Sequence, residues 1–393
     1  MVDPLPKVSI KNLPEFLYAN CVQDNHLVGM VGRVGTGKSS AIAQLVAKLD
    51  AEFKAGSLVL PEHNYKGCQL VDKRLTSCLA VDLRGVPDLS GDWASWKSPD
   101  DWPLEGNLKF DRDILYVVFV DEYTSVSDRS VHAACQELFL DRSLSGKPLG
   151  QNTRLIWAGN MGDDRAIVNS IPSSNRNRSI QIETYNTVED WLEYILDNCE
   201  KPNRYGVVMG REIAESAWAY HTWKNKHEKQ ALHTFDPKDK EQIVFATHRS
   251  WEAALIAMRD TTRPLWVRQS AASGLIGSDQ AILFLEFMKL KDTIVDIKAI
   301  LADPLGAPLP DKKKMDHVYV TALTCSGNIT ADTADAIHAY LKRMDTIFLV
   351  MAWQLAIKRD TDAAKKAGKT GKLRTTAAYL EFCQKYAGVF TDQ

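Results

Sequence analysis

The stretch VGMVGRVGTGKSSAIAQLVAKL, residues 28–49, decides the fold of the first half of the chain. The apolar run that leads to Gly32 is typical of a buried strand, and the apolar residues after Ser40 recur at helical spacing. Between them, Gly32 to Ser39 fit the pattern G-x-x-x-x-G-K-S. A strand, a glycine-rich turn and a helix in this order predict a loop that binds phosphate groups.

Each part of this loop suits a bound triphosphate. Glycines let the backbone N–H groups point inward and form an anion nest, and the helix N-terminus adds partial positive charge. The Lys38 ammonium can reach the β- and γ-phosphates, and the Ser39 hydroxyl can ligate Mg²⁺. We therefore predict that ATP and Mg²⁺ bind here. The nucleotide-binding residues are Gly32, Arg33, Val34, Gly35, Thr36, Gly37, Lys38, Ser39 and Ser40.

A second strand supplies carboxylates. Residues 114–120, ILYVVFV, are all apolar, and Asp121 and Glu122 follow them. Such a run is typical of a central parallel strand that is covered on both faces. In α/β sheets the chemistry gathers at the carboxyl ends of the strands. We expect Asp121 to hold Mg²⁺ and Glu122 to polarise the attacking water.

Three further polar side chains follow. The strand TRLIWAGN, residues 153–160, ends in Asn160, whose amide would orient water near the γ-phosphate, although Asn is also an ordinary turn residue. Arg176 and Arg178 precede a short strand, where Arg is usually only solvated. A hydrolase needs a cation besides Lys38, and an arginine finger from a neighbour contributes about 10³–10⁵ in rate. We expect Arg178, or alternatively Arg176, to be that finger, which requires an oligomer.

The order of these motifs resembles that of the AAA+ ATPases, and within them the MoxR-like and chelatase-like group. The Walker A loop, VVFVDE, IWAGN and RNR follow one another as they do there, and residues 136–146, QELFLDRSLSG, resemble the segment after the acidic strand. Residues 233–252, HTFDPKDKEQIVFATHRSWE, resemble the lid of that group, in which Arg249 would be the second sensor of the γ-phosphate.

The chain departs from the group at two positions. His248 stands where the usual pattern has Pro, and Ser179 stands where Phe often follows the finger arginine. The second difference leaves the choice between Arg178 and Arg176 open.

The resemblance implies a fold, an activity and partners. The fold is α/β: a P-loop AAA+ core with a parallel sheet and flanking helices (residues 1–185), a small helical lid (186–275) and a helical C-terminal region (276–393). The activity is Mg²⁺-dependent ATP hydrolysis by a homo-oligomeric, hexameric ring that remodels or activates a protein partner. The resemblance further implies that such chains occur often in phage and bacterial genomes, sometimes beside a von Willebrand A-type partner.

Composition places the chain among ordinary globular proteins. It has 393 residues, 45% of them hydrophobic and 25% charged, with a net charge of -2, which argues against wholesale nucleic-acid coating. Seven cysteines without a CxxC pair, and an N-terminus without the apolar core of a signal peptide, favour a cytoplasmic protein. Residues 347–357, IFLVMAWQLAI, are too few to span a bilayer and predict a buried helix.

Three other segments leave alternatives open. The long insertion between residues 84 and 113 carries Trp93, Trp96 and Trp102, which either contact a partner or pack on their own domain. Residues 358–374 hold seven Lys and Arg, which are either solvated or bind nucleic acid, as a motor or loader on the same AAA+ core would. Residues 78–85 and, more weakly, 56–63 are further strand candidates.

Three other functions fit less well. A GTPase needs Asn-Lys-x-Asp for guanine, and NKHE at residue 225 lacks the Asp. A small-molecule kinase needs no finger from a neighbour, and a non-hydrolysing scaffold does not need Glu122.

The histidines His221, His227 and His233 recur every six residues and so do not share one helix face for zinc.

Overall fold

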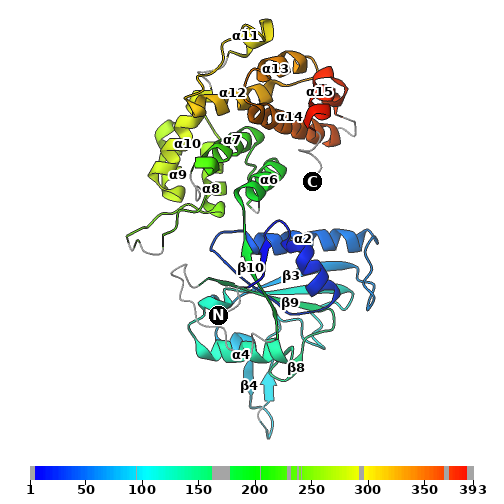
Figure 1. The fold of residues 1–393 in the computed structure, drawn as a ribbon. Helices are drawn as coiled ribbons and strands as arrows, with labels where there is room; N and C mark the ends of the chain where they lie inside the picture. Colours follow the sequence, from blue (N-terminus) through cyan, green and yellow to red (C-terminus); the bar gives the residue numbers. More distant parts are fainter. Residues whose placement is uncertain are drawn as a thin grey trace. The chain divides into compact units, whose positions relative to one another are not determined.

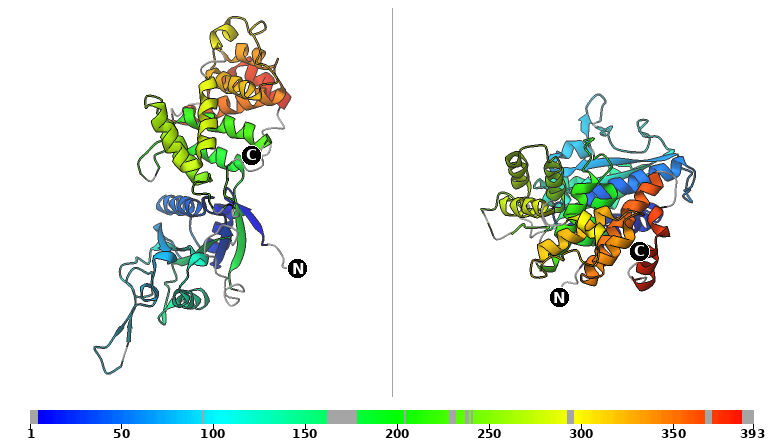
Figure 2. Two further views of the ribbon diagram at one scale, coloured as in Figure 1. Left: turned by 90° about the vertical axis from the view of Figure 1, so that its left-hand side faces the viewer. Right: turned by 90° about the horizontal axis from the view of Figure 1, so that it is seen from above.

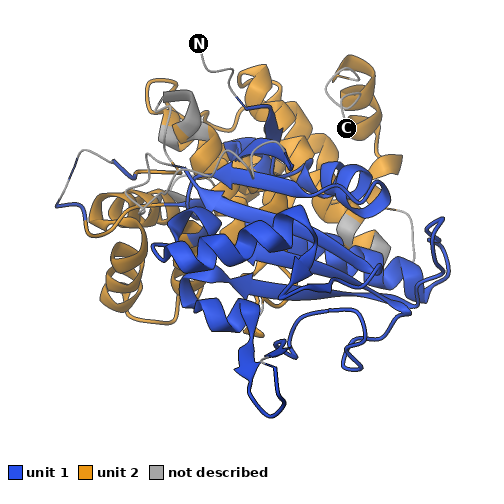
Figure 3. Ribbon diagram, turned by 90° about the horizontal axis from the view of Figure 1, so that it is seen from below, with its two compact units in different colours: residues 1–190, 235–242, 247–249 blue, residues 191–234, 243–246, 250–393 orange. Residues whose placement is uncertain are grey.

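The computed structural model describes residues 5–93, 95–161, 178–203, 205–227, 232–236, 239, 241–291, 296–366 and 371–386. The chain divides into two compact units, coloured separately in Figure 3. Unit 1 comprises residues 1–190, 235–242 and 247–249, and unit 2 comprises residues 191–234, 243–246 and 250–393. The three domains predicted from the sequence, with limits at 185 and 275, remain a prediction.

Unit 1 is built on one parallel sheet of six strands, in the order β1-β10-β2-β9-β6-β3 (Figure 1). The strands are β1 (Lys7–Ser9), β2 (Val28–Gly32), β3 (Gly67–Arg74), β6 (Ile114–Asp121), β9 (Thr153–Asn160) and β10 (Ile180–Tyr185). The three strands predicted to carry the site, β2, β9 and β6, are neighbours, so their carboxyl ends meet at one edge of the sheet. The parallel sheet, its flanking helices and the helices that follow confirm the predicted α/β fold class.

Helices cover both faces of this sheet. The α1 helix (Leu13–Leu17), the π-helix η1 (Tyr18–Gln23) and α2 (Lys38–Lys54) pack on one face, and α4 (Arg129–Leu140) packs on the other (Figure 1). Alternate residues of β6 enter the two cores: Val117 and Phe119 face α2, whereas Val118 and Val120 face α4. Burial on both faces explains why β6 is a continuous apolar run.

Two of the weaker strand predictions were wrong. Residues 78–85 contain the short helix α3 (Ala80–Arg84), whose N-terminus is capped by Asp82, because its carboxylate accepts from the Leu79 N–H at 2.8 Å. Residues 56–63 form no strand, only an isolated bridge between Leu60 and His63. The strand beside β6 is instead β3, which lies at the end of the sheet and ends in the three charged residues Asp72, Lys73 and Arg74.

The insertion between residues 84 and 113 separates its three tryptophans. It contains a hairpin of β4 (Val86–Asp88) and β5 (Ser95–Lys97), drawn in cyan in the left view of Figure 2, which projects away from the sheet. Trp102 is 1% exposed and belongs to the core on the α4 side, whereas Trp93 is 88% and Trp96 51% exposed. Packing on its own domain therefore holds for Trp102, whereas contact of Trp93 and Trp96 with a partner stays a prediction. The second small hairpin of unit 1 joins β7 (Ser143–Leu144) to β8 (Lys147–Pro148).

Unit 2 is helical in its described residues. Its helices are α6 (Val188–Asn198, which begins in unit 1), α7 (Arg211–His227), α8 (His248–Met258, which also begins in unit 1), α9 (Leu265–Ile276), α10 (Ser278–Lys291), α11 (Ile297–Ala302), α12 (Met315–Asn328), α13 (Ala334–Leu341), α14 (Thr346–Lys366) and α15 (Ala377–Tyr386). Thr187 caps α6, because its hydroxyl accepts from the Asp190 N–H at 3.0 Å. No described helix is long and apolar enough to cross a membrane.

The apolar run of residues 347–357 lies in α14 and is largely buried. Trp353 stacks on Phe382 of α15 with ring centroids 5.4 Å apart, in a core shared by α13, α14 and α15. The chain breaks between α13 and α14, so the buried run of residues 347–357 belongs to α14 alone. The break ends at Asp345, a residue type that favours the position before a helix.

Candidate nucleotide-binding site

The loop between β2 and α2 takes the backbone conformation that its glycines permit. Gly35 and Gly37 have φ of 74° and 107°, in the left-handed region that other residues rarely adopt. A Cβ on Gly35 would also lie 2.8 Å from the Thr247 hydroxyl. The loop therefore depends on glycine at Gly35, both for its turn and for the close approach of Thr247.

Lys38 lies inside the curl of the loop. Its ammonium donates to the Gly32 carbonyl at 2.8 Å and to the Arg33 carbonyl at 3.0 Å, and the residue is buried. The Thr36 hydroxyl donates to the same Arg33 carbonyl at 3.0 Å. This arrangement holds a cation at the helix N-terminus, where an anion is favoured.

The other predicted loop residues act through their backbone if they bind phosphate. The side chains of Arg33 and Ser40 are exposed, and that of Val34 is half-buried. The Thr36 carbonyl accepts from the Asn186 amide at 3.2 Å, which ties the loop to the residue after β10.

Ser39 and Asp121 meet although they are far apart in the sequence. The Ser39 hydroxyl, at the start of α2, donates to Asp121 Oδ2 at 3.1 Å, and Asp121 ends β6. Two neighbouring ligands of octahedral Mg²⁺, each at about 2.1 Å, lie about 3 Å apart. Both atoms are hard oxygen donors at that separation, so the pair fits Mg²⁺. Among the described residues, no group of three or more His, Cys, Asp and Glu could hold a metal ion, so phosphate and water would supply the other ligands.

Glu122 follows Asp121 in a left-handed backbone conformation, with φ of 61° and ψ of 25°. Its N–H donates to Asp121 Oδ1 at 2.9 Å, and its carboxylate accepts a hydrogen bond from the Thr76 hydroxyl. Thr76 lies in the 3-10 helix η2 (Leu75–Ser77), directly after β3. The sequence did not reveal this partner, because the strand that carries it was not predicted.

The Thr76 contact yields a prediction. A hydrogen bond to an ionised carboxylate contributes about 1.5–3 kcal/mol and lowers its readiness to take a proton. We expect Thr76→Val to raise basal ATP hydrolysis by roughly 3- to 10-fold, a part of that energy. Thr76→Ser is the matched control and should stay within twofold of wild type in steady-state phosphate release. A slower Thr76→Val variant would mean that the hydroxyl positions Glu122 instead.

Asn160 lies beside the loop. In the sheet register it pairs with Gly32, the last residue of β2. Its amide nitrogen donates to the Ser125 hydroxyl at 3.2 Å, and its backbone N–H and carbonyl both contact the Thr124 hydroxyl, at 2.8 and 3.1 Å. Asn160 is therefore fixed next to the segment that follows Glu122.

Arg249 reaches the loop through its backbone. Its N–H donates to the Gly35 carbonyl at 3.3 Å, and Thr247 lies against Gly35. Residues 247–249 accordingly belong to unit 1, although they lead into α8. The predicted second sensor is thus joined to the phosphate loop itself.

Arg178 lies at the opposite edge of the sheet from the loop. It comes two residues before β10, whose first residue, Ile180, pairs with Val28, whereas Thr184 pairs with Gly32. Four residue steps along the strand separate these two pairs, which corresponds to about 13 Å. Arg178 is exposed and cannot reach the loop of its own subunit. Arg176 lies outside the described residues.

Two charged residues of β3 also face the site. In the register, Arg74 pairs with Asp121, and Asp72 pairs with Phe119, so both lie on the α2 face of the sheet. Burial raises the pKa of Asp72; Arg74 opposes this shift, and the carboxylates of Asp121 and Glu122 add to it. The sequence missed both residues, since β3 was not predicted.

Comparison with known proteins adds little to this geometry. No model of a protein family matches the chain, and no curated protein matches it. Among solved structures, NtrX from Brucella abortus in complex with ADP is 11% identical with a TM-score of 0.37, over 95% of this chain and 67% of that one. PCH-2 from C. elegans is 13% identical with a TM-score of 0.27, over 88% and 66%.

A third similar structure is ORC2 from Aeropyrum pernix in ADPNP–ADP complexes. It is 12% identical with a TM-score of 0.35, over 86% of this chain and 84% of that one. Likenesses this weak say nothing about what the present chain binds, so function has to be inferred from its own residues.

Proposed function

We propose that this chain is a Mg²⁺-dependent ATPase of the AAA+ class that works as a homo-oligomeric ring, expected to be hexameric, and remodels or activates a protein partner. The observation that carries the proposal is the contact of Ser39 with Asp121 beside the buried Lys38. Loop, cation and acidic strand end converge as ATP–Mg²⁺ requires.

The residues divide the work of binding and hydrolysis. The N–H groups of residues 33–39 and the Lys38 ammonium would hold the phosphates, and Ser39 and Asp121 would hold Mg²⁺. When bound, Mg²⁺ neutralises charge on the phosphate oxygens. Glu122 would take a proton from the attacking water, and Asn160 would orient that water.

Subunits are expected to complete each other's sites. Arg178 lies too far from its own loop to act there, which favours a role on the nucleotide of a neighbour. The hydrogen bond from Arg249 to Gly35 offers a path by which the loop would report loss of the γ-phosphate to the helices that follow. Ligand contacts that differ between two states drive such changes.

Two of the seven cations that suggested the nucleic-acid alternative form ion pairs within unit 2. Lys358 pairs with Asp197 at 2.6 Å, and Arg359 pairs with Glu215 at 2.6 Å. The first cations of the basic segment are thus engaged within unit 2 rather than presented to phosphates. We therefore retain remodelling or activation of a protein partner as the proposed function. The resemblance offers a von Willebrand A-type protein as the candidate partner.

The phosphate loop gives the first test. Lys38→Ala removes the ammonium that would contact the phosphates, so we expect a roughly 10- to 160-fold weaker affinity for ATP–Mg²⁺, since a charged hydrogen bond contributes about 1.5–3 kcal/mol. Titration with a fluorescent ATP analogue measures it. Lys48→Ala, an exposed lysine of the same helix, is the control and should bind as wild type does. Equal affinity in the Lys38 and Lys48 variants would remove ATP from this loop.

A further inference from the structure

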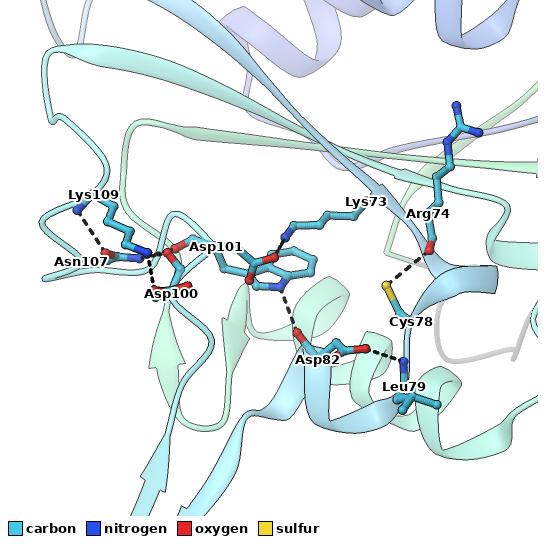
Figure 4. A network of polar contacts seen from close by, with 10 residues as sticks. Lys73, Arg74, Cys78, Leu79, Asp82, Asp100, Asp101, Asn107 and Lys109 are labelled. Atoms are coloured by element: carbon cyan, nitrogen blue, oxygen red, sulfur yellow. Dashed lines mark hydrogen bonds and ion pairs between the residues drawn. The ribbon is translucent and has the colours of Figure 1, made fainter.

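The dipeptide Asp-Trp occurs twice in the insertion, as Asp92–Trp93 and as Asp101–Trp102. The second copy, Asp101–Trp102, contacts a lysine of its own chain. The Lys73 ammonium lies 4.8 Å from the centre of the Trp102 ring and forms an ion pair with Asp101. Figure 4 shows Lys73 pointing toward Asp101. Ring and carboxylate thus hold one cation together.

Trp102 and Lys73 of this contact are largely buried, and Trp102 is held by a hydrogen bond. Trp102 is buried, and its indole N–H donates to the Asp82 carbonyl at 3.3 Å. The Lys73 side chain is only 12% exposed. A cation between an aromatic face and an acid is stabilised by both, more strongly as water is excluded.

The first copy, Asp92–Trp93, has the same two side chains, but no described cation contacts them. Asp92 and Trp93 lie in the turn of the hairpin between β4 and β5, and both are exposed. Within the described part of the chain, no side chain pairs with the Asp92 carboxylate and no cation lies over the Trp93 ring. The sole ion pair of the hairpin itself joins Lys97 to Asp88 at 2.9 Å, among the residues that the structure describes.

The surroundings are both apolar and acidic. Residues 79–96 expose six large apolar side chains: Leu79, Val81, Val86, Leu89, Trp93 and Trp96. An exposed cluster of this kind is typical of an interaction surface. Of the seven Asp and Glu in residues 84–113, four are paired with lysines (Asp88, Asp100, Asp101 and Asp113), whereas Asp92 has no such pair among the described residues. The surface is therefore complementary to a partner that is apolar and basic.

We propose that Asp92 and Trp93 bind a lysine or arginine side chain of a partner polypeptide, as Asp101 and Trp102 bind Lys73. Val86 and Leu89 would contact apolar residues beside that cation. A groove of about 750 Å³ at the base of the hairpin, lined in part by Val81 and Val86, offers room for the rest of the segment. The acidic charge of this surface disfavours nucleic acid.

This inference rests on the proposed function only in its choice of a polypeptide as the occupant. Binding to the hairpin needs no nucleotide, so it is measured on the full chain without ATP and again in the Lys38→Ala variant. Loss of ATP binding in that variant with peptide binding intact would separate the two sites. Intact ATP binding with no peptide binding would overturn only the present inference.

The test uses three fluorescein-labelled 12-residue peptides, which alternate Leu with Lys, Ser or Glu, and fluorescence anisotropy. The Lys peptide is expected to bind, and the Ser and Glu peptides to bind at least fivefold more weakly. Trp93→Ala should weaken the Lys peptide roughly 3- to 5-fold, as an exposed cation–π contact of about 0.5–1 kcal/mol predicts. Asp92→Asn should weaken it about twofold, as an exposed ion pair does.

Two control variants distinguish a specific contact of Asp92 and Trp93 from a general effect of charge. Glu105→Gln removes an exposed acid of the same insertion that has no adjacent tryptophan. It should leave the affinity within 1.5-fold of wild type, and an effect as large as that of Asp92→Asn would reduce the binding to bulk charge. Trp93→Phe keeps a weaker ring and should fall between wild type and Trp93→Ala. Equal binding of the Lys and Ser peptides, or a 20-nucleotide single-stranded DNA that binds through Trp93, would overturn the proposal.

Discussion

Glu122→Gln is expected to bind ATP–Mg²⁺ as wild type does and to hydrolyse it roughly 10²–10⁴-fold more slowly, the range that loss of a positioned general base produces. The amide keeps the size of the side chain and can still accept from Thr76, but it cannot take a proton from water. Asp121 and Ser39 remain to hold the metal, so binding is preserved. Single-turnover hydrolysis and nucleotide titration on the same sample measure the two effects.

The control for this variant is Glu105→Gln, which changes the same functional group on an exposed loop of unit 1 and should hydrolyse ATP at the wild-type rate. Brisk turnover by Glu122→Gln would refute its role as the base. A proportional loss of binding and hydrolysis would assign Glu122 to binding instead. Because the variant should retain ATP, it is also the form in which to capture the protein partner.

Arg178→Ala should lower hydrolysis by about 10³–10⁵-fold, the range for loss of an arginine finger. The expected effect is large because transition-state charge on the γ-phosphate would lose the cation that a neighbouring subunit is expected to supply. ATP affinity should change little. Steady-state phosphate release at saturating ATP checks the first point, and nucleotide titration checks the second.

Arg112→Ala, which removes another exposed arginine of unit 1, is the matched control and should be indistinguishable from wild type. Near-normal hydrolysis by Arg178→Ala would exclude it as the finger and leave Arg176 to be tested in the same way. Loss of oligomers in the variant would show a structural role, so its mass in solution is measured beside its activity.

The central strands could be predicted from the sequence because burial on both faces requires a continuous run of apolar residues, which is easy to recognise. β6 and β9 were expected where they occur, since parallel strands beneath two helical layers are apolar throughout. β3 was missed for the opposite reason. It lies at the end of the sheet, is only partly buried and finishes in three charged residues, so its sequence, GCQLVDKR, resembles a loop more than a strand.

The candidate site was predicted where its residues belong to one local motif and was missed where they meet only in space. Lys38 and Ser39 follow from the loop itself. Thr76 and Arg74 become neighbours of Glu122 and Asp121 only through the pairing of β3 with β6. A prediction that lacks the strand cannot include them.

The insertion shows a similar limit. Asp92–Trp93 and Asp101–Trp102 are the same dipeptide, and nothing local tells which tryptophan will be buried. The difference arises from position: Trp102 reaches the core beside α4, whereas Trp93 lies in the hairpin turn. Only the structure separates the structural tryptophan from the one available to a partner.

The most direct test of the central claim, that one subunit holds the nucleotide and the next supplies the cation, mixes Arg178→Ala subunits with Glu122→Gln subunits. Each variant alone should be nearly inactive. In random rings of equal parts, about a quarter of the head-to-tail interfaces join an intact Glu122 to an intact Arg178. We predict recovery of hydrolysis toward that fraction of wild type. Mixed rings, verified by mass, that show no recovery at any ratio would contradict the claim.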